Sequence, residues 1–277
     1  MAGLALDLVY THNKTRKIKG SRNTAIKICG VLDNDKIARL EGLLSEAVSK
    51  KREIKANTYR TRVLRKIAMR GIRISEKLPD VFLDEADVKG LVGEMLLEGL
   101  ILSRGHSLVY VKWRNSGTSH SNGLDIIASD THTSKPKLMI GESKHIHNAI
   151  KSASAHIVIK DKCVEALEQS DVNHVLLSLA RIVADFAEAI NFQEAVKGNT
   201  TDLEPKFLLL KDSLENLDYL LDLSVFLDAS YCTTDAFDRS MDELPEYGND
   251  ITVSIAGVET LENTTQLMCE KFAGPRS

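Results

Sequence analysis

Cysteine pairs of the kind that bind zinc are missing from this sequence of 277 residues. The four cysteines, Cys29, Cys163, Cys232 and Cys269, are far apart and form no Cys-x-x-Cys motif. This spacing argues against a zinc ribbon and against a small secreted fold held by disulfides. We therefore expect free thiols in a reducing compartment.

Long apolar segments are missing as well. Charged residues interrupt the longest apolar runs, such as Glu94 and Glu98 in one of them, so none approaches the ~20 clean residues of a membrane span. The first ten residues, "MAGLALDLVY", place apolar residues before basic ones, the reverse of a secretory signal. We expect a cytoplasmic protein without membrane contact.

Aromatic residues are scarce, and several catalytic motifs are absent. Aromatics make up 5% of the chain, with Trp113 the single tryptophan, so base stacking is not expected to dominate any binding of nucleic acid. The sequence has no GxxxxGK[ST] motif, which argues against nucleotide hydrolysis. It also lacks the GxSxG elbow of many serine hydrolases.

The charge is divided unevenly along the chain. Residues 1–80 hold 19 Lys and Arg against 8 Asp and Glu, a net charge of +11, whereas the remainder has a net charge of −14. Such asymmetry suggests a surface for nucleic acid or for an acidic partner at the basic end. The alternative is two solvated faces that neutralise each other. We expect a basic α+β N-terminal portion, 1–80, and a second domain, 81–277.

Hydrophobic periodicity predicts an α/β fold with a mixed central sheet flanked by helices. The predicted helices span 35–54, 59–72, 84–105, 148–196 with a break near Asp171, and a last one through Met268. The predicted strands span 4–10, 24–32, 107–113, 124–129, 137–144, 206–211, 222–229 and 251–258.

Charged residues stand inside or beside the most apolar of these strands. Glu142 and Lys144 alternate with Ser143, so they project from one side of their strand. Asp125 opens the preceding strand and can lie close to that pair if the two strands are neighbours. Glu94 on the preceding helix can supply a third carboxylate. Mg²⁺ suits such a group, because it prefers oxygen ligands and keeps several waters beside one or two carboxylates.

This arrangement resembles the PD-(D/E)xK nuclease superfamily. The residues that carry the resemblance are Glu94 on a helix, Asp125 at the start of a strand, and Glu142-Ser143-Lys144 on the next strand. The proline of the motif is replaced by Leu124, and 16 residues separate Asp125 from Glu142. The resemblance implies hydrolysis of phosphodiesters with Mg²⁺, for which Mn²⁺ can substitute. It implies metal ligation by Asp125, Glu142 and Glu94, and a catalytic lysine at Lys144.

The chain also resembles the nuclease subunits of the Hachiman anti-phage defence system, over roughly residues 80–270 and most strongly from Gly90 to Ile159. The segments concerned are "KGLVGEMLLEGLI", "NGLDIIAS", "LMIGESKH" and "HNAIKSASAHI". This resemblance implies a DNA nuclease that acts with, and is restrained by, a superfamily-2 helicase partner.

Several alternatives stay open. Glu142 and Lys144 can be an exposed edge pair, Asp125 can cap a turn, and Glu98 competes with Glu94 for the helical position. The pair His145 and His147 lacks a third ligand for zinc, so contact with phosphate is the better interpretation. Lys151, Lys160 and Lys162 can meet phosphates or form a solvated face. The chain can also be a non-catalytic adaptor, an RNase or a restriction-type enzyme on the same fold.

The predicted helix 59–72 and its exit are crowded with basic side chains. They are Arg60, Arg62, Arg65, Lys66, Arg70 and Arg73. We expect this surface to dock the helicase or to bind DNA, and we favour docking because the predicted site lies in the acidic remainder of the chain.

Overall fold

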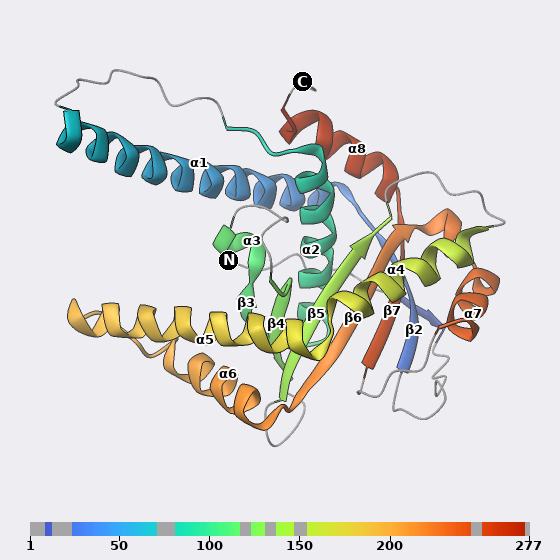
Figure 1. Cartoon of the computed structure of the whole chain (residues 1–277). Helices are drawn as coiled ribbons and strands as arrows, with labels where there is room; N and C mark the ends of the chain where they lie inside the picture. Colours follow the sequence, from blue (N-terminus) through green and yellow to red (C-terminus); the bar gives the residue numbers. More distant parts are fainter. Residues whose placement is uncertain are drawn as a thin grey trace.

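The structure of the chain is a computed structural model that describes residues 9–12, 24–70, 81–116, 123–130, 137–146, 154–244 and 251–274. Its strands form one seven-stranded sheet in the order β1-β2-β7-β6-β5-β4-β3 (Figure 1). The strands β2, β7, β6 and β5 run parallel, and the other neighbours pair antiparallel. Their bounds are β1 Val9–His12, β2 Thr24–Val31, β3 Ser107–Val111, β4 Ile126–Asp130, β5 Lys137–His145, β6 Tyr219–Asp228 and β7 Ile251–Glu259. This confirms the predicted α/β class with a mixed sheet.

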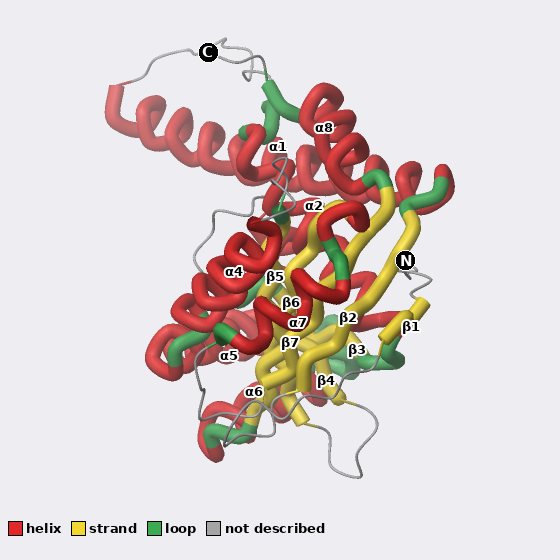
Figure 2. Tube along the Cα trace, turned by 90° about the vertical axis from the view of Figure 1, so that its right-hand side faces the viewer, coloured by secondary structure: helices red, strands yellow, loops and turns green. Residues whose placement is uncertain are grey.

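Helices cover both faces of the sheet, so the fold has three layers (Figures 1 and 2). One core contains side chains of α1 (Asn34–Arg70), α2 (Glu85–Ser103) and α8 (Leu261–Phe272). The other core contains side chains of α4 (Ala155–Gln169), α5 (Val172–Ala195), α6 (Glu204–Asn216) and α7 (Thr234–Asp242). On β5 the strand periodicity decides the face: Leu138 and Ile140 enter the second core, and Met139 enters the first.

The basic leading portion shares the sheet with the remainder of the chain. Strand β2 pairs in parallel with β7 from Thr24 opposite Thr252 to Val31 opposite Glu259. Residues 4–8 of the first predicted strand, 4–10, lie outside the described residues, and β1 extends from Val9 to His12. The division of the chain at residue 80 stays a prediction, since strand pairing alone does not decide where a domain ends.

The sequence-based boundaries were wrong in four places. The two helices expected at 35–54 and 59–72 form one helix, α1, of 37 residues. The strand expected at 107–113 ends at Val111, and Lys112–Ser116 form the short helix α3. The strand expected at 206–211 is part of α6. The acidic segment between β6 and β7, for which no helix was predicted, contains α7.

Helix α6 shows why a short apolar run is ambiguous. "KFLLLK" is apolar enough for a buried strand, but Leu208 is 61% exposed while Leu210 and Ser213, three residues apart, are buried. That spacing is helical, and a proline in the first turn favours the start of a helix.

Helix α2 packs closely against β5 at two glycines, one of which directly precedes Glu94. A Cβ at Gly93 would lie 3.0 Å from Cβ of His145, and one at Gly141 would lie 3.1 Å from Leu97 and Ile101 side-chain atoms. Both contacts are tighter than most side chains tolerate, so the two glycines permit this approach. Glu94 directly follows Gly93 and is thereby held beside β5.

Among the described residues, no helix is both long enough and apolar enough to cross a membrane.

Candidate active site

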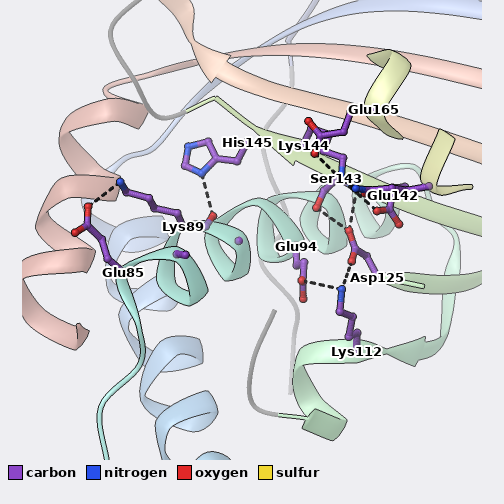
Figure 3. Close-up of a pocket in the computed structure, with 13 residues that line it drawn as sticks. Glu85, Lys89, Glu94, Lys112, Asp125, Glu142, Ser143, Lys144, His145 and Glu165 are labelled. Atoms are coloured by element: carbon purple, nitrogen blue, oxygen red, sulfur yellow. Dashed lines mark hydrogen bonds and ion pairs between the residues drawn. The ribbon is translucent and has the colours of Figure 1, made fainter. Parts of the chain in front are cut away.

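A pocket of about 620 Å³ opens where α2, the start of β4, the end of β5 and α4 meet (Figure 3). All four residues proposed from the sequence line it, namely Glu94, Asp125, Glu142 and Lys144. The other residues that line it are Glu85, Ala86, Lys89, Gly90, Lys112, Ser143, His145, Glu165 and Gln169. Residues from α2, α3, β5 and α4, together with Asp125 just before β4, therefore share one concave surface.

Strand register brings Asp125 to Glu142. Ile126 pairs with Gly141 in the antiparallel ladder of β4 and β5. One step further along the same register sets Asp125 opposite Glu142. Both residues are almost fully buried: Asp125 is 4% exposed and Glu142 is 8% exposed. The expectation that neighbouring strands carry the two acids is thus met by the pairing.

Asp125 is fixed by three hydrogen bonds. Its Oδ2 accepts from the backbone N of Ser143 at 3.0 Å and from Ser143 Oγ at 3.1 Å. Its Oδ1 accepts from Nζ of Lys112 at 2.7 Å. A carboxylate held in this way has little freedom to rotate, so its position is set before any ligand binds.

Glu94 meets the same lysine. Its Oε1 lies 3.5 Å from Nζ of Lys112, and its Oε2 is buried without a hydrogen-bond partner among the described residues. A buried carboxylate oxygen without a partner is costly, which makes it a candidate ligand for a cation. Figure 3 shows the Lys112 side chain reaching up between Glu94 and Asp125.

Two carboxyl groups of the pocket, those of Glu94 and Glu142, have raised pKa values. Burial raises the pKa of Glu94 well above its usual value, the charge of Asp125 raises it further, and Lys112 offsets part of the shift. Burial and the charge of Asp125 raise the pKa of Glu142 to about 8, against the lowering effect of Lys144. Acids that repel one another in a buried site are a common feature of functional sites.

Lys144 lies on the α4 side of the pocket. Its Nζ is 3.6 Å from Oε1 of Glu142 and 3.7 Å from Oε1 of Glu165, and it donates to Oε1 of Gln169. An ammonium held by three oxygen-bearing groups has a defined position. It can place a positive charge beside a phosphate that enters the pocket.

Glu98, the alternative to Glu94 on the helix, and His145 both bind other groups. Glu98 forms an ion pair with Arg114, whose guanidinium lies 5.1 Å from the Trp113 ring centre, and Glu98 is not among the residues that line the pocket. Both ring nitrogens of His145 are engaged, Nδ1 with the Lys89 carbonyl at 3.1 Å and Nε2 with Thr265 Oγ1 at 3.3 Å.

The lysines that follow the predicted site do not line the pocket where they are described. Lys160 pairs with Glu243 at 3.5 Å, and Lys162 with Glu165 at 2.5 Å. His147 and Lys151 lie outside the described residues. Contact of Lys160 and Lys162 with phosphate stays a prediction.

Sequence reasoning missed Lys112, Glu165 and Gln169. The sequence did point to Lys112, because a lysine within the apolar segment "VYVKW" needs a charged partner if the segment is buried. In the structure Lys112 is only 7% exposed. Glu165 and Gln169 gave no signal, since they stand on a helix with many other polar residues.

The donor set suits a hard divalent cation such as Mg²⁺ in kind, because it consists of carboxylates and includes the unpartnered oxygen of Glu94. Within the described residues, however, no group of three or more His, Cys, Asp or Glu side chains is arranged to hold a metal. The position of the Lys112 ammonium between Glu94 and Asp125 is consistent with that result.

No protein-family model matches the chain, and no curated protein matches it.

Proposed function

We propose that this protein is a metal-dependent DNA nuclease of the PD-(D/E)xK type. The observation that supports it most is the convergence of Glu94, Asp125, Glu142 and Lys144 on one pocket. They come from a helix, the start of a strand and the next strand of a mixed sheet, the order that the resemblance implies.

The proposed chemistry assigns a role to each side chain. Asp125, Glu142 and Glu94 would hold Mg²⁺, or Mn²⁺ in its place, which when bound polarises the phosphate and lowers the pKa of a water molecule. Ser143 keeps the Asp125 carboxylate in position through its two hydrogen bonds. The Lys144 ammonium stabilises the negative charge that develops on the phosphate in the transition state.

The proposal extends to the biological setting. The resemblance to the nuclease subunits of the Hachiman system, the HamA proteins, suggests an antiviral effector that a superfamily-2 helicase restrains. A sequence-tolerant nuclease free in a cell would attack the host chromosome, so some restraint is needed. Binding to a larger partner is the simplest form of it.

Cleavage assays test the proposal directly. The purified protein is incubated with plasmid, linear DNA and RNA, with Mg²⁺, Mn²⁺ or EDTA, alone and with the helicase. Degradation of DNA that needs the metal and disappears in Glu142→Gln supports the proposal. Cleavage of RNA alone would indicate an RNase, and discrete DNA fragments a restriction-type enzyme. DNA binding without cleavage under every condition would contradict it and favour an adaptor.

A further inference from the structure

One residue of the pocket, Lys112, is not used by the proposed chemistry. It stands at the junction of β3 and α3, 7% exposed, with its ammonium 2.7 Å from Oδ1 of Asp125 and 3.5 Å from Oε1 of Glu94. It is a different lysine from Lys144, which lies with Glu142, Glu165 and Gln169. The pocket thus contains two ammonium groups with separate partners.

Lys112 is tied to Asp125 through its backbone as well. Its N–H donates to the carbonyl oxygen of Asp125 at 2.9 Å, in addition to the side-chain ion pair. This backbone hydrogen bond joins the residue that directly follows β3 to the residue that directly precedes β4, so both residues are held in place. This double link gives the ammonium a defined place rather than a choice of surface positions.

The charges explain why an ammonium belongs there. Glu94 and Asp125 are buried together, and two buried carboxylates without a cation would repel each other strongly. The Lys112 ammonium lies within ion-pair distance of both and offsets part of that repulsion. The same two carboxylates are those that a divalent cation would use.

We propose that Lys112 is an internal counter-cation that holds the Glu94–Asp125 pair in the metal-free protein and competes with the divalent cation for that pair. A metal bound by these carboxylates would lie next to the positive charge of Lys112 and be repelled by it. The Lys112 ammonium must therefore move away from the carboxylates when the metal binds. This inference rests on the proposed function for the metal, and goes beyond it by naming what the metal displaces.

Competition has a definite thermodynamic signature. A group that stabilises the metal-free form weakens metal binding by the same free energy. Replacing Lys112 with a neutral residue should lower the stability of the metal-free protein and tighten its binding of metal. A residue that merely packed or merely helped to bind the metal would not change both quantities in these opposite directions.

The test uses two neutral variants of the full chain, Lys112→Met, which keeps the apolar stem, and Lys112→Gln, which keeps a hydrogen-bond donor for Asp125. Binding of Mn²⁺ is measured by titration calorimetry, and unfolding by urea in EDTA. We expect the Kd for Mn²⁺ to fall about tenfold or more in both variants, while stability in EDTA falls. If Lys112→Met does not fold in EDTA, Lys112→Gln decides the matter.

The control variant is Lys51→Met. Lys51 also pairs with a buried aspartate, Asp87, at 3.1 Å, but neither residue lines the pocket. It should lose stability without any change in the Kd for Mn²⁺. A change in Kd equal to that of the Lys112 variants would show a general effect of lost charge, and would overturn the proposal.

The remaining outcomes separate this inference from the proposed function. If the wild type cleaves DNA with metal but both Lys112 variants bind Mn²⁺ no more tightly than it does, the inference fails alone. If the variants bind Mn²⁺ more tightly but the wild type never cleaves, the nuclease proposal fails and the competition stands. If no form binds Mn²⁺, both fail.

Discussion

Ser143 holds Asp125 through two hydrogen bonds to the same oxygen, one from its backbone N at 3.0 Å and one from its hydroxyl at 3.1 Å. Ser143 is the middle residue of the Glu-x-Lys segment, so the strand that carries Glu142 and Lys144 also orients the aspartate of the neighbouring strand. Three consecutive residues of β5 thereby act on the same pocket.

Ser143→Ala removes the hydroxyl bond and leaves the backbone bond. We expect the free energy of unfolding to fall by about 0.5–1.5 kcal/mol, the usual effect of one hydrogen bond, with weaker binding of metal. Urea unfolding and Mn²⁺ titration measure the two effects. Ser45→Ala is the control, because the Ser45 hydroxyl donates to the Glu41 carbonyl on an exposed turn of α1. Equal effects of the two changes would contradict a special role for Ser143.

Lys144→Ala should abolish cleavage and leave the fold intact, because its charge is needed in the transition state rather than in the core. The measurement is single-turnover cleavage with circular dichroism as the check on folding. Lys211→Ala serves as the control, since Lys211 pairs with Glu215 at 3.9 Å on α6 and does not line the pocket. Cleavage by Lys144→Ala at the wild-type rate would show that Lys144 is not catalytic.

The raised pKa of Glu142 predicts a dependence of stability on pH in the absence of metal. Below pH 4.5, the usual pKa of a glutamate, the carboxyl is protonated in both the folded and unfolded states and costs nothing. Above that pH the unfolded chain loses its proton first, so folding stability falls until about pH 8, where the folded pKa lies. Mg²⁺ should restore more stability at pH 8 than at pH 5.

Thermal unfolding at several pH values, in EDTA and in Mg²⁺, measures this effect. Other groups also titrate, so the relevant quantity is the difference between the wild type and Glu142→Gln. We expect the wild type to lose stability relative to the variant as the pH rises in EDTA. A constant difference between pH 5 and pH 8 would contradict the raised pKa.

Gly93→Val tests whether the close approach of α2 to β5 positions Glu94. The added side chain would meet His145 Cβ at about 3.0 Å, so the helix must move away from the strand. We expect a loss of about 1–3 kcal/mol in the free energy of unfolding, as in other overpacked cores. Gly42→Val is the matched control on α1, where nothing lies within 4 Å of an added Cβ, and should change little. Equal stabilities would rule out a packing role for Gly93.

The sequence was most informative where periodicity and chemistry agreed. The strands β2, β4 and β5 and the helix α2 lie where alternation and helical spacing predicted them, and the four polar residues within them share a pocket. Predictions for short segments were wrong, because a short apolar run such as "KFLLLK" is compatible with both a strand and a helix. The partnership of Lys112 with Glu94 could not be foreseen, since it depends on the order of strands in the sheet.

The C-terminal half of α1 carries the basic residues that we expect to dock the helicase or to bind DNA. The distal half of α1 extends away from the sheet (Figure 1), and Arg52, Glu53, Ile54 and Lys55 are exposed along it. The side chains of Arg60, Arg62, Arg65, Lys66 and Arg70 and all of Arg73 lie outside the described part, so their use stays a prediction. We favour docking of the helicase over binding of DNA, because the pocket lies elsewhere, among α2, β5 and α4.

Charge reversal at Arg62, Arg65 and Lys66 separates the two uses. If the surface docks the helicase, the variant should form less complex while the isolated protein's cleavage of DNA is unchanged. If it binds DNA, the variant should lose affinity and show a shallower dependence on salt, because fewer phosphate contacts release fewer counterions. Co-purification with the helicase and DNA titrations at several salt concentrations measure both. Recovery of the complex at wild-type yield would eliminate docking through this surface.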